Sequence, residues 1–243
     1  MEFHTLYVNK EKAISNALTS IFLSFSLLCL LQTQGYAEIS KITPRVFLSD
    51  MPSARSKQEL SKHRITHILD VGKGDRDFLG NSWSKPTGFR AEDYYSLTEL
   101  AQTFSFSNIP MDDSREFSIL PYFDWVRVTI SDVLNTVPNS RVLIHCSQGI
   151  SRSATLVIAY LMLDQGYSLF EARTIVMRER PIVHPNRGFL EKLEALDEFL
   201  KSEQSDTVTL SPAIPGSFTA SKLLRRYRYL GLRDALPSIN VGD

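Results

Sequence analysis

His-Cys-Ser-Gln-Gly-Ile-Ser-Arg-Ser occupies residues 145–153 and decides how the middle of the chain folds. The apolar run 142–144 precedes this stretch and a run of helical composition, 154–163, follows it. The sequence therefore predicts a strand, a tight loop and a helix N-terminus. Gly149 suits the sharp bend, because glycine adopts positive φ at no steric cost. The thiol of Cys146 would lie where the strand gives way to the loop.

The predicted loop is suited to bind a phosphate-like dianion. A helix N-terminus presents unpaired backbone N–H groups and the positive end of the helix dipole. Successive N–H groups in a curled loop form a concave anion site. The planar guanidinium of Arg152 can hold two phosphate oxygens at once. The candidate phosphate-binding positions are Ser147, Gln148, Gly149, Ile150, Ser151 and Arg152.

The same positive field acts on Cys146, whose thiol is expected to ionise readily beside an arginine at a helix N-terminus. The thiolate is then a nucleophile that can form a phosphocysteine. Ser153 is placed to hydrogen-bond the thiolate or to help the sulfur leave, and His145 is placed to organise the loop by hydrogen bonds. A lone cysteine is more often a small core residue. The spacing of Gly149, Arg152 and Ser153 after Cys146 favours the nucleophile.

The pattern His-Cys-x5-Arg-Ser resembles the phosphate loop of cysteine-based protein phosphatases. Its continuation, Ser-Arg-Ser-Ala-Thr-Leu-Val-Ile-Ala-Tyr-Leu-Met at 151–162, is similar to dual-specificity phosphatases, and the likeness extends from about Ile42 to about Leu200. It is closest to small atypical members that carry only the catalytic domain. The resemblance implies hydrolysis of phosphotyrosine and of phosphoserine or phosphothreonine in phosphoprotein substrates, protein kinases among the candidates. The alternative is a phosphoprotein-binding adaptor or a weakly active pseudophosphatase.

A phosphatase of this kind needs a general acid that protonates the leaving oxygen. Residues 109–117, Ile-Pro-Met-Asp-Asp-Ser-Arg-Glu-Phe, supply two adjacent carboxylates on a predicted loop. The resemblance implies that the acid is the aspartate three residues after Pro110, which is Asp113, with Asp112 as the fallback. Without the cysteine loop, both would be interpreted as solvated loop acids. In the second step the same carboxylate would act as the base that activates water.

Residues 184–190, His-Pro-Asn-Arg-Gly-Phe-Leu, are similar to the Pro-Asn-x-Gly-Phe segment of the family. In the family this asparagine bonds the backbone of the phosphate loop and holds its shape. The resemblance therefore assigns a supporting role to Asn186. Asparagine is also a favoured helix N-cap, so Asn186 is expected to begin the last helix as well.

The loop residues between Cys146 and Arg152 carry no charge. Relatives that act on inositol lipids resemble one another in having lysines there, and RNA-end phosphatases tend to have Asn before the arginine and Thr after it. The neutral loop therefore favours a singly phosphorylated protein side chain. The 27 basic and 27 acidic residues give a net charge of zero. The chain as a whole therefore lacks the positive electrostatic field that would predict nucleic-acid binding. No metal or cofactor is expected: His63 and His67 are four residues apart but lie at the edge of a predicted strand, which favours a structural or solvated role, and no Walker or dinucleotide glycine pattern occurs.

Alternating strands and helices predict an α/β fold with a central, mainly parallel, twisted sheet flanked by helices; the resemblance implies the cysteine-phosphatase fold. Strands are expected at 46–48, 65–71, 104–109 and 142–145, and helices at 122–137, 154–165, 169–179 and 187–201. Gly166 should stop the second helix, and Ser168 with Glu171 predicts a capping box for the third. Residues 72–88 are interpreted as a loop. The phosphate loop would lie at the carboxyl end of a central strand, where such sheets bind ligands.

The 243 residues predict one catalytic domain, 41–202, between two end segments. Segment 1–40 contains an uncharged apolar run at 13–31, interpreted as a signal peptide, a membrane anchor or a buried helix. Segment 203–243 combines a Ser/Thr/Pro-rich linker with a basic–aromatic patch at 223–230. A free thiolate favours the cytoplasm, with the nucleus also open, because reducing compartments keep thiols reduced. The run at 13–31 keeps membrane association or the secretory pathway as the alternative, and the oligomeric state is unknown.

Overall fold

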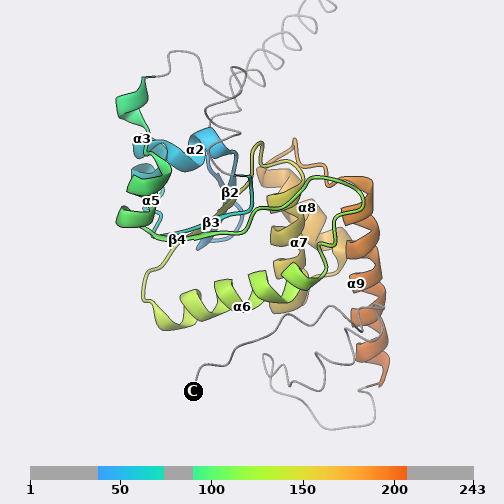
Figure 1. Ribbon diagram of the computed structural model, residues 1–243. Helices are drawn as coiled ribbons and strands as arrows, with labels where there is room; N and C mark the ends of the chain where they lie inside the picture. The colour runs from blue at the N-terminus through green and yellow to red at the C-terminus, as the bar shows by residue number, and fades with distance from the viewer. Residues whose placement is uncertain (1–37, 74–89, 207–243) are drawn as a thin grey trace, which may run out of the picture. The chain divides into compact units, whose positions relative to one another are not determined.

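The computed structural model describes residues 38–73 and 90–206 (Figure 1). The apolar run at 13–31, most of the predicted loop at 72–88 and the basic–aromatic patch at 223–230 lie outside these residues. Within the two described ranges, no helix has the length and apolar character needed to cross a bilayer.

A five-stranded sheet forms the centre of the domain, in the order β1-β2-β5-β3-β4. The strands are β1 (Ser40–Lys41), β2 (Val46–Ser49), β3 (His67–Asp70), β4 (Ser105–Asn108) and β5 (Val142–His145). β1 pairs antiparallel with β2, and the other three pairings are parallel. This confirms the predicted α/β fold with a mainly parallel sheet. β5 lies between β2 and β3 although, among the described residues, it is the last strand along the chain.

Successive residues of β5 face opposite sides of the sheet, and each side has its own hydrophobic cluster. Leu143 belongs to a smaller cluster that includes Ala54 and Leu100, whereas Ile144 belongs to a larger one with Phe123. Burying such apolar side chains contributes about 1.5–3 kcal/mol each. Two groups of helices cover the two faces (Figure 1). They are α2 (Met51–Arg55), α3 (Lys57–Lys62) and α5 (Leu97–Thr103) on the smaller cluster, and α6 (Pro121–Thr136), α7 (Arg152–Asp164), α8 (Leu169–Glu179) and α9 (Arg187–Asp206) on the larger.

The predicted helix signals are confirmed in detail around α7 and α8. Gly166 adopts φ +75 just after α7 ends, and Ser168 with Glu171 forms the capping box of α8. α7 begins at Arg152, two residues before the predicted start, with Ser151 as its N-cap residue. Strand β1 and helices α2, α3 and α5 were not predicted, because β1 has only two residues and a helix of five to seven residues has too few turns to establish a helical hydrophobic period.

Candidate active site

The phosphate loop, residues 146–152, connects the end of β5 to the start of α7. His145, the last residue of β5, pairs with Ser49 of β2 and Asp70 of β3, so three parallel strands end at this edge of the sheet. Gly149 has φ +64, which confirms the predicted bend. A Cβ at this position would come within 2.4 Å of the Ser49 carbonyl oxygen. Both the backbone conformation and the close approach therefore require glycine at residue 149.

Two hydrogen-bond donors converge on the sulfur of Cys146. The backbone N–H of Gly149 donates to Sγ at 3.3 Å, and the Ser153 hydroxyl donates to it at 3.1 Å. Cys146 is a free cysteine and is almost fully buried. The sulfur therefore has one donor from the phosphate loop and one from the first turn of α7.

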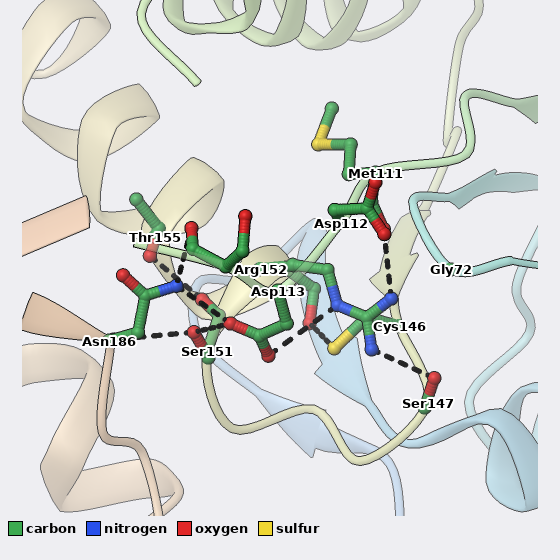
Figure 2. Close-up of polar contacts among 12 residues, drawn as sticks. Gly72, Met111, Asp112, Asp113, Cys146, Ser147, Ser151, Arg152, Thr155 and Asn186 are labelled. Atoms are coloured by element: carbon green, nitrogen blue, oxygen red, sulfur yellow. Dashed lines mark hydrogen bonds and ion pairs between the residues drawn. The ribbon is translucent and has the colours of Figure 1, made fainter. Parts of the chain in front are cut away.

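The guanidinium of Arg152 contacts both the phosphate loop and residues 109–117, the acid loop. Nη1 donates to the Met111 carbonyl oxygen at 3.1 Å, and Nη2 donates to Ser147 Oγ at 2.9 Å. Nε lies 3.6 Å from Asp113 Oδ2. These contacts place the guanidinium beside Cys146 and the carboxylate (Figure 2). Arg152 is buried, so its orientation is fixed before a substrate arrives.

Asp113 is held against the phosphate loop by two hydrogen bonds to one of its oxygens. Oδ1 accepts from Ser151 Oγ at 2.6 Å and from Asn186 Nδ2 at 2.8 Å (Figure 2). Oδ2 faces Arg152 Nε. Because Oδ1 already accepts two hydrogen bonds, a proton carried by Asp113 belongs on Oδ2. This is the oxygen that faces the guanidinium.

The neighbouring carboxylate, Asp112, has a different environment. Its side chain is 55 % exposed and forms an ion pair with Lys73, whereas Asp113 is 35 % exposed and contacts Arg152. The geometry therefore supports Asp113, rather than the fallback Asp112, as the general acid.

Asn186 differs from its expected role. Its side chain does not reach the backbone of the phosphate loop; Nδ2 donates to Asp113 and, at 3.4 Å, to the Ser114 carbonyl oxygen. Oδ1 accepts from Phe189 N at 3.0 Å, which confirms Asn186 as the N-cap of α9. The backbone N–H of Asn186 donates to Ser151 Oγ at 3.1 Å. Asn186 therefore supports the acid, because its amide nitrogen donates to the Asp113 carboxylate and to the carbonyl of the residue that follows it.

The acid loop rests on the first turn of α9. A Cβ at Gly188 would come within 2.1 Å of the Arg115 carbonyl oxygen, so glycine permits this close approach. The rings of Phe117 and Phe189 meet edge to face at 6.4 Å, and Arg115 pairs with Glu191 at 3.1 Å. Helix α9 thus packs against the part of the acid loop that follows Ser114.

His145 lies behind the loop, where its Nδ1 is 3.8 Å from Asp70 Oδ1. Burial lowers the pKa of His145, and the Asp70 carboxylate opposes that effect. Its expected role in organising the loop through hydrogen bonds stays a prediction. Among the described residues, no group of three His, Cys, Asp or Glu side chains could hold a metal ion.

Arg180 was not singled out from the sequence. It caps the C-terminus of α8 and is buried, and it donates hydrogen bonds to two carbonyls of the phosphate loop, those of Gln148 and Gly149. In the sequence it follows Arg178 by two residues and directly precedes Pro181. The proline marks the helix end, but nothing local distinguishes a buried arginine from an exposed one.

Asp50, which lies 3.9 Å from Arg180, makes the stability of this region depend on pH. Burial raises the pKa of Asp50 from 3.8 to about 6, against the lowering effects of Ser53 and Arg180. The folded protein then binds the Asp50 proton more tightly than the unfolded chain does. The contribution of this proton to the free energy of unfolding is therefore fully present below a pH of 3.8, the ordinary pKa of the group. It is lost as the pH rises through about 6. The difference between the two pKa values corresponds to a change in unfolding free energy of about 3 kcal/mol at most.

Asp50→Asn should remove this pH dependence, since asparagine caps α2 equally well but does not ionise. Urea unfolding of both proteins would be measured at about pH 4, 5, 6 and 7.5. The wild type should lose stability relative to the variant as the pH rises, by up to about 3 kcal/mol. Parallel curves for the two proteins would contradict a raised pKa at Asp50.

Known proteins with the same features identify the family. The sequence model of the family described as "Dual specificity phosphatase, catalytic domain" matches residues 46–198 of this chain. Mouse dual specificity protein phosphatase 13B is 36% identical over 177 residues, which cover 73% of this chain and 81% of that protein.

Solved structures share the fold. Human tyrosine phosphatase-like serine/threonine/tyrosine-interacting protein superposes with a TM-score of 0.53 at 27% identity, covering 67% of this chain and 97% of that one. Human DUSP28 has a TM-score of 0.52 at 21% identity, covering 67% of this chain and 95% of that one. The fold is therefore the cysteine-phosphatase fold that the resemblance implied. Together with the family match and the similarity to 13B, this shows that the chain belongs to the dual specificity phosphatase family and is a dual-specificity protein phosphatase.

Proposed function

We propose that the chain hydrolyses phosphotyrosine and phosphoserine or phosphothreonine in proteins through a phosphocysteine at Cys146. The observation that carries this proposal is the convergence of the Gly149 N–H and the Ser153 hydroxyl on Sγ. Asp113 is held against the same loop. A nucleophile, an anion site and a proton donor thus meet at one edge of the sheet.

In the first step, the Cys146 thiolate attacks phosphorus and forms the S–P bond while the bond to the leaving oxygen breaks. Oδ2 of Asp113 gives its proton to that oxygen, which leaves as a phenol or an alcohol. Arg152 holds the phosphate oxygens with Nε and Nη2, as Ser147 releases Nη2 and Asp113 Oδ2 turns from Nε to the leaving oxygen. The charge that spreads over the phosphoryl oxygens is stabilised by the N–H groups of the loop.

In the second step, water attacks the phosphocysteine and the Asp113 carboxylate accepts its proton. The S–P bond breaks, inorganic phosphate leaves, and the sulfur becomes a thiolate again. The Ser153 hydroxyl, 3.1 Å from Sγ, stabilises the sulfur as it leaves. Asp113 ends the cycle protonated and ready for the next substrate.

The uncharged loop supports a singly phosphorylated protein side chain as the substrate. Ser147 and Ser151 are engaged with Arg152 and Asp113, and Gln148 is the exposed member of the loop. No lysine or arginine between Cys146 and Arg152 is present to meet a second phosphate. Phosphoproteins, with protein kinases among the candidates, therefore fit the loop better than inositol lipids do.

The test is phosphate release from matched phosphotyrosyl, phosphoseryl and phosphothreonyl peptides and from vesicles that contain phosphoinositides. All three peptides should be hydrolysed in a vanadate-sensitive reaction, and acid quenching should trap phosphate on Cys146. Release from phosphoinositides should be at least about tenfold slower, which corresponds to about 1.4 kcal/mol of lost binding to the additional phosphates. Preferred hydrolysis of the lipid, or phosphate trapped on another residue, would contradict the proposal.

A further inference from the structure

Four consecutive carbonyl groups of the phosphate loop accept hydrogen bonds from outside the loop. The Ser147 carbonyl accepts from Met51 N at 3.2 Å, and the Ile150 carbonyl accepts from His184 N at 2.9 Å. Between them, the Gln148 carbonyl accepts from Arg180 Nη2 at 3.0 Å, and the Gly149 carbonyl accepts from Arg180 Nε at 2.9 Å. The outer side of the loop is thus lined by donors, two of which belong to a single side chain.

These outward hydrogen bonds determine where the loop N–H groups point. In a trans peptide the C=O and the following N–H point in opposite directions. A carbonyl held outward therefore aims the N–H of the next residue inward. The peptide between Gln148 and Gly149 shows this directly, since Arg180 holds its carbonyl while its N–H donates to Cys146 Sγ at 3.3 Å. By the same geometry, the hydrogen bond from Arg180 to the Gly149 carbonyl aims the N–H of Ile150 inward.

The position of the Arg180 guanidinium is itself fixed. The residue is 3% exposed, its Nη1 lies 3.4 Å from Ser40 Oγ, and its Nη2 lies 3.9 Å from Asp50 Oδ2. A Cβ at Gly149 would come within 2.9 Å of Nη2, so the guanidinium lies directly against the loop. An apolar residue could end α8 without the cost of burying a charge. The buried charge is accounted for by the two loop carbonyls that it contacts and by the Asp50 carboxyl group.

We propose that Arg180 is a positioning residue: it holds the Gln148 and Gly149 carbonyls outward and thereby aims the Gly149 N–H at the Cys146 sulfur and the Ile150 N–H at the substrate phosphate. This inference rests on the proposed function and adds to it a residue that touches neither substrate nor sulfur. Two adjacent carbonyl oxygens match the planar fork of a guanidinium, whereas the ammonium of lysine is a single point charge. Of the four outer contacts, only those of Arg180 can be removed by a side-chain substitution, because Met51 and His184 donate from the backbone.

The experiment compares Arg180→Ala and Arg180→Lys with the wild type. The matched control is Arg178→Ala, which removes an exposed arginine that pairs with Glu179 on the same helix. Three quantities are measured: kcat/KM on a phosphotyrosyl peptide, the inhibition constant of vanadate, and the ratio of Cys146 alkylation by iodoacetate to that by iodoacetamide. The anionic reagent needs the anion site, whereas the neutral one reports only the reactivity of the sulfur. A merely structural role of Arg180 would leave this ratio unchanged.

We expect Arg180→Ala to lower kcat/KM on the order of 10²-fold, comparable to the loss of one donor from an oxyanion hole. Vanadate inhibition should weaken about tenfold or more, a loss of about 1.4 kcal/mol. The alkylation ratio should fall, Arg180→Lys should give intermediate values, and Arg178→Ala should match the wild type.

An Arg180→Ala protein with native circular dichroism, unchanged vanadate inhibition and an unchanged alkylation ratio would overturn the inference. If Arg180→Ala does not fold, the same three measurements on Arg180→Lys decide the matter. A wild type that shows no hydrolysis dependent on Cys146 would instead contradict the proposed function. The alkylation ratio still tests Arg180 in that case, since it requires no turnover.

Discussion

Cys146→Ser is expected to abolish phosphate release and to preserve phosphoprotein binding. The serine hydroxyl is not ionised near neutral pH, so the two donors that converge on Sγ no longer activate a nucleophile. Arg152 and the loop N–H groups stay in place and still bind the phosphate. Loss of a covalent nucleophile should lower kcat on the order of 10⁵-fold or more.

Phosphate release from a phosphotyrosyl peptide and retention of phosphoproteins on immobilised protein would be measured in parallel. The double variant Cys146→Ser with Arg152→Ala is the matched control, and it should lose retention as well because the guanidinium fork is gone. Equal release by the wild type and Cys146→Ser would refute the enzyme mechanism and favour the phosphoprotein-binding adaptor. If Cys146→Ser itself still hydrolyses the peptide at a substantial rate, the nucleophile is another residue.

Asp113→Asn is expected to lower kcat by roughly 10²–10⁴-fold, the usual contribution of general acid–base catalysis. Asparagine can keep the position, because its Oδ1 still accepts from Ser151 Oγ, but it has no proton to give from Oδ2. The loss should be larger for phosphoserine, whose alkoxide is a poor leaving group, than for an aryl phosphate with an acidic phenol. This dependence is measured with a series of aryl phosphates whose phenols differ in acidity, as the slope of the logarithm of kcat against the pKa of the phenol.

Asp112→Asn is the matched control for that prediction. Its carboxylate lies one residue away but pairs with Lys73 rather than with Arg152, so near-normal rates and an unchanged slope are expected. If Asp112→Asn shows the larger loss and the steeper slope, the acid is Asp112 and the assignment is wrong by one residue.

The sequence predicted the parts of this site that depend on local chemistry. The strand, loop and helix around Cys146, the positive φ of Gly149 and the capping box of α8 follow from neighbouring residues, and the structure confirms them. The choice between Asp113 and Asp112 needed the family resemblance. The geometry then supported it through Ser151 and Arg152, whose contacts with Asp113 span 38 and 39 residues of sequence.

Other features could not be predicted, because they depend on which distant segments meet. Asn186 was expected to bond the loop backbone, but the carboxylate of Asp113 lies within reach of its amide and is the stronger acceptor. From the sequence alone, Arg180 cannot be distinguished from a surface arginine, because its burial depends on how α8 packs beside the phosphate loop. The short helices α2, α3 and α5 owe their stability to burial against the sheet rather than to their own period.

The order in which the site is assembled has a consequence for synthesis on the ribosome. A nascent chain that has emerged only as far as the end of α7 contains all of 146–152, but it lacks Arg180, His184 and Asn186, which hold the loop carbonyls and the acid. Domains emerge from the N-terminus first, at about 5–20 residues per second. The thiol is therefore made before the residues that shape its surroundings, and a chain truncated at the end of α7 would carry the signature sequence without a finished site.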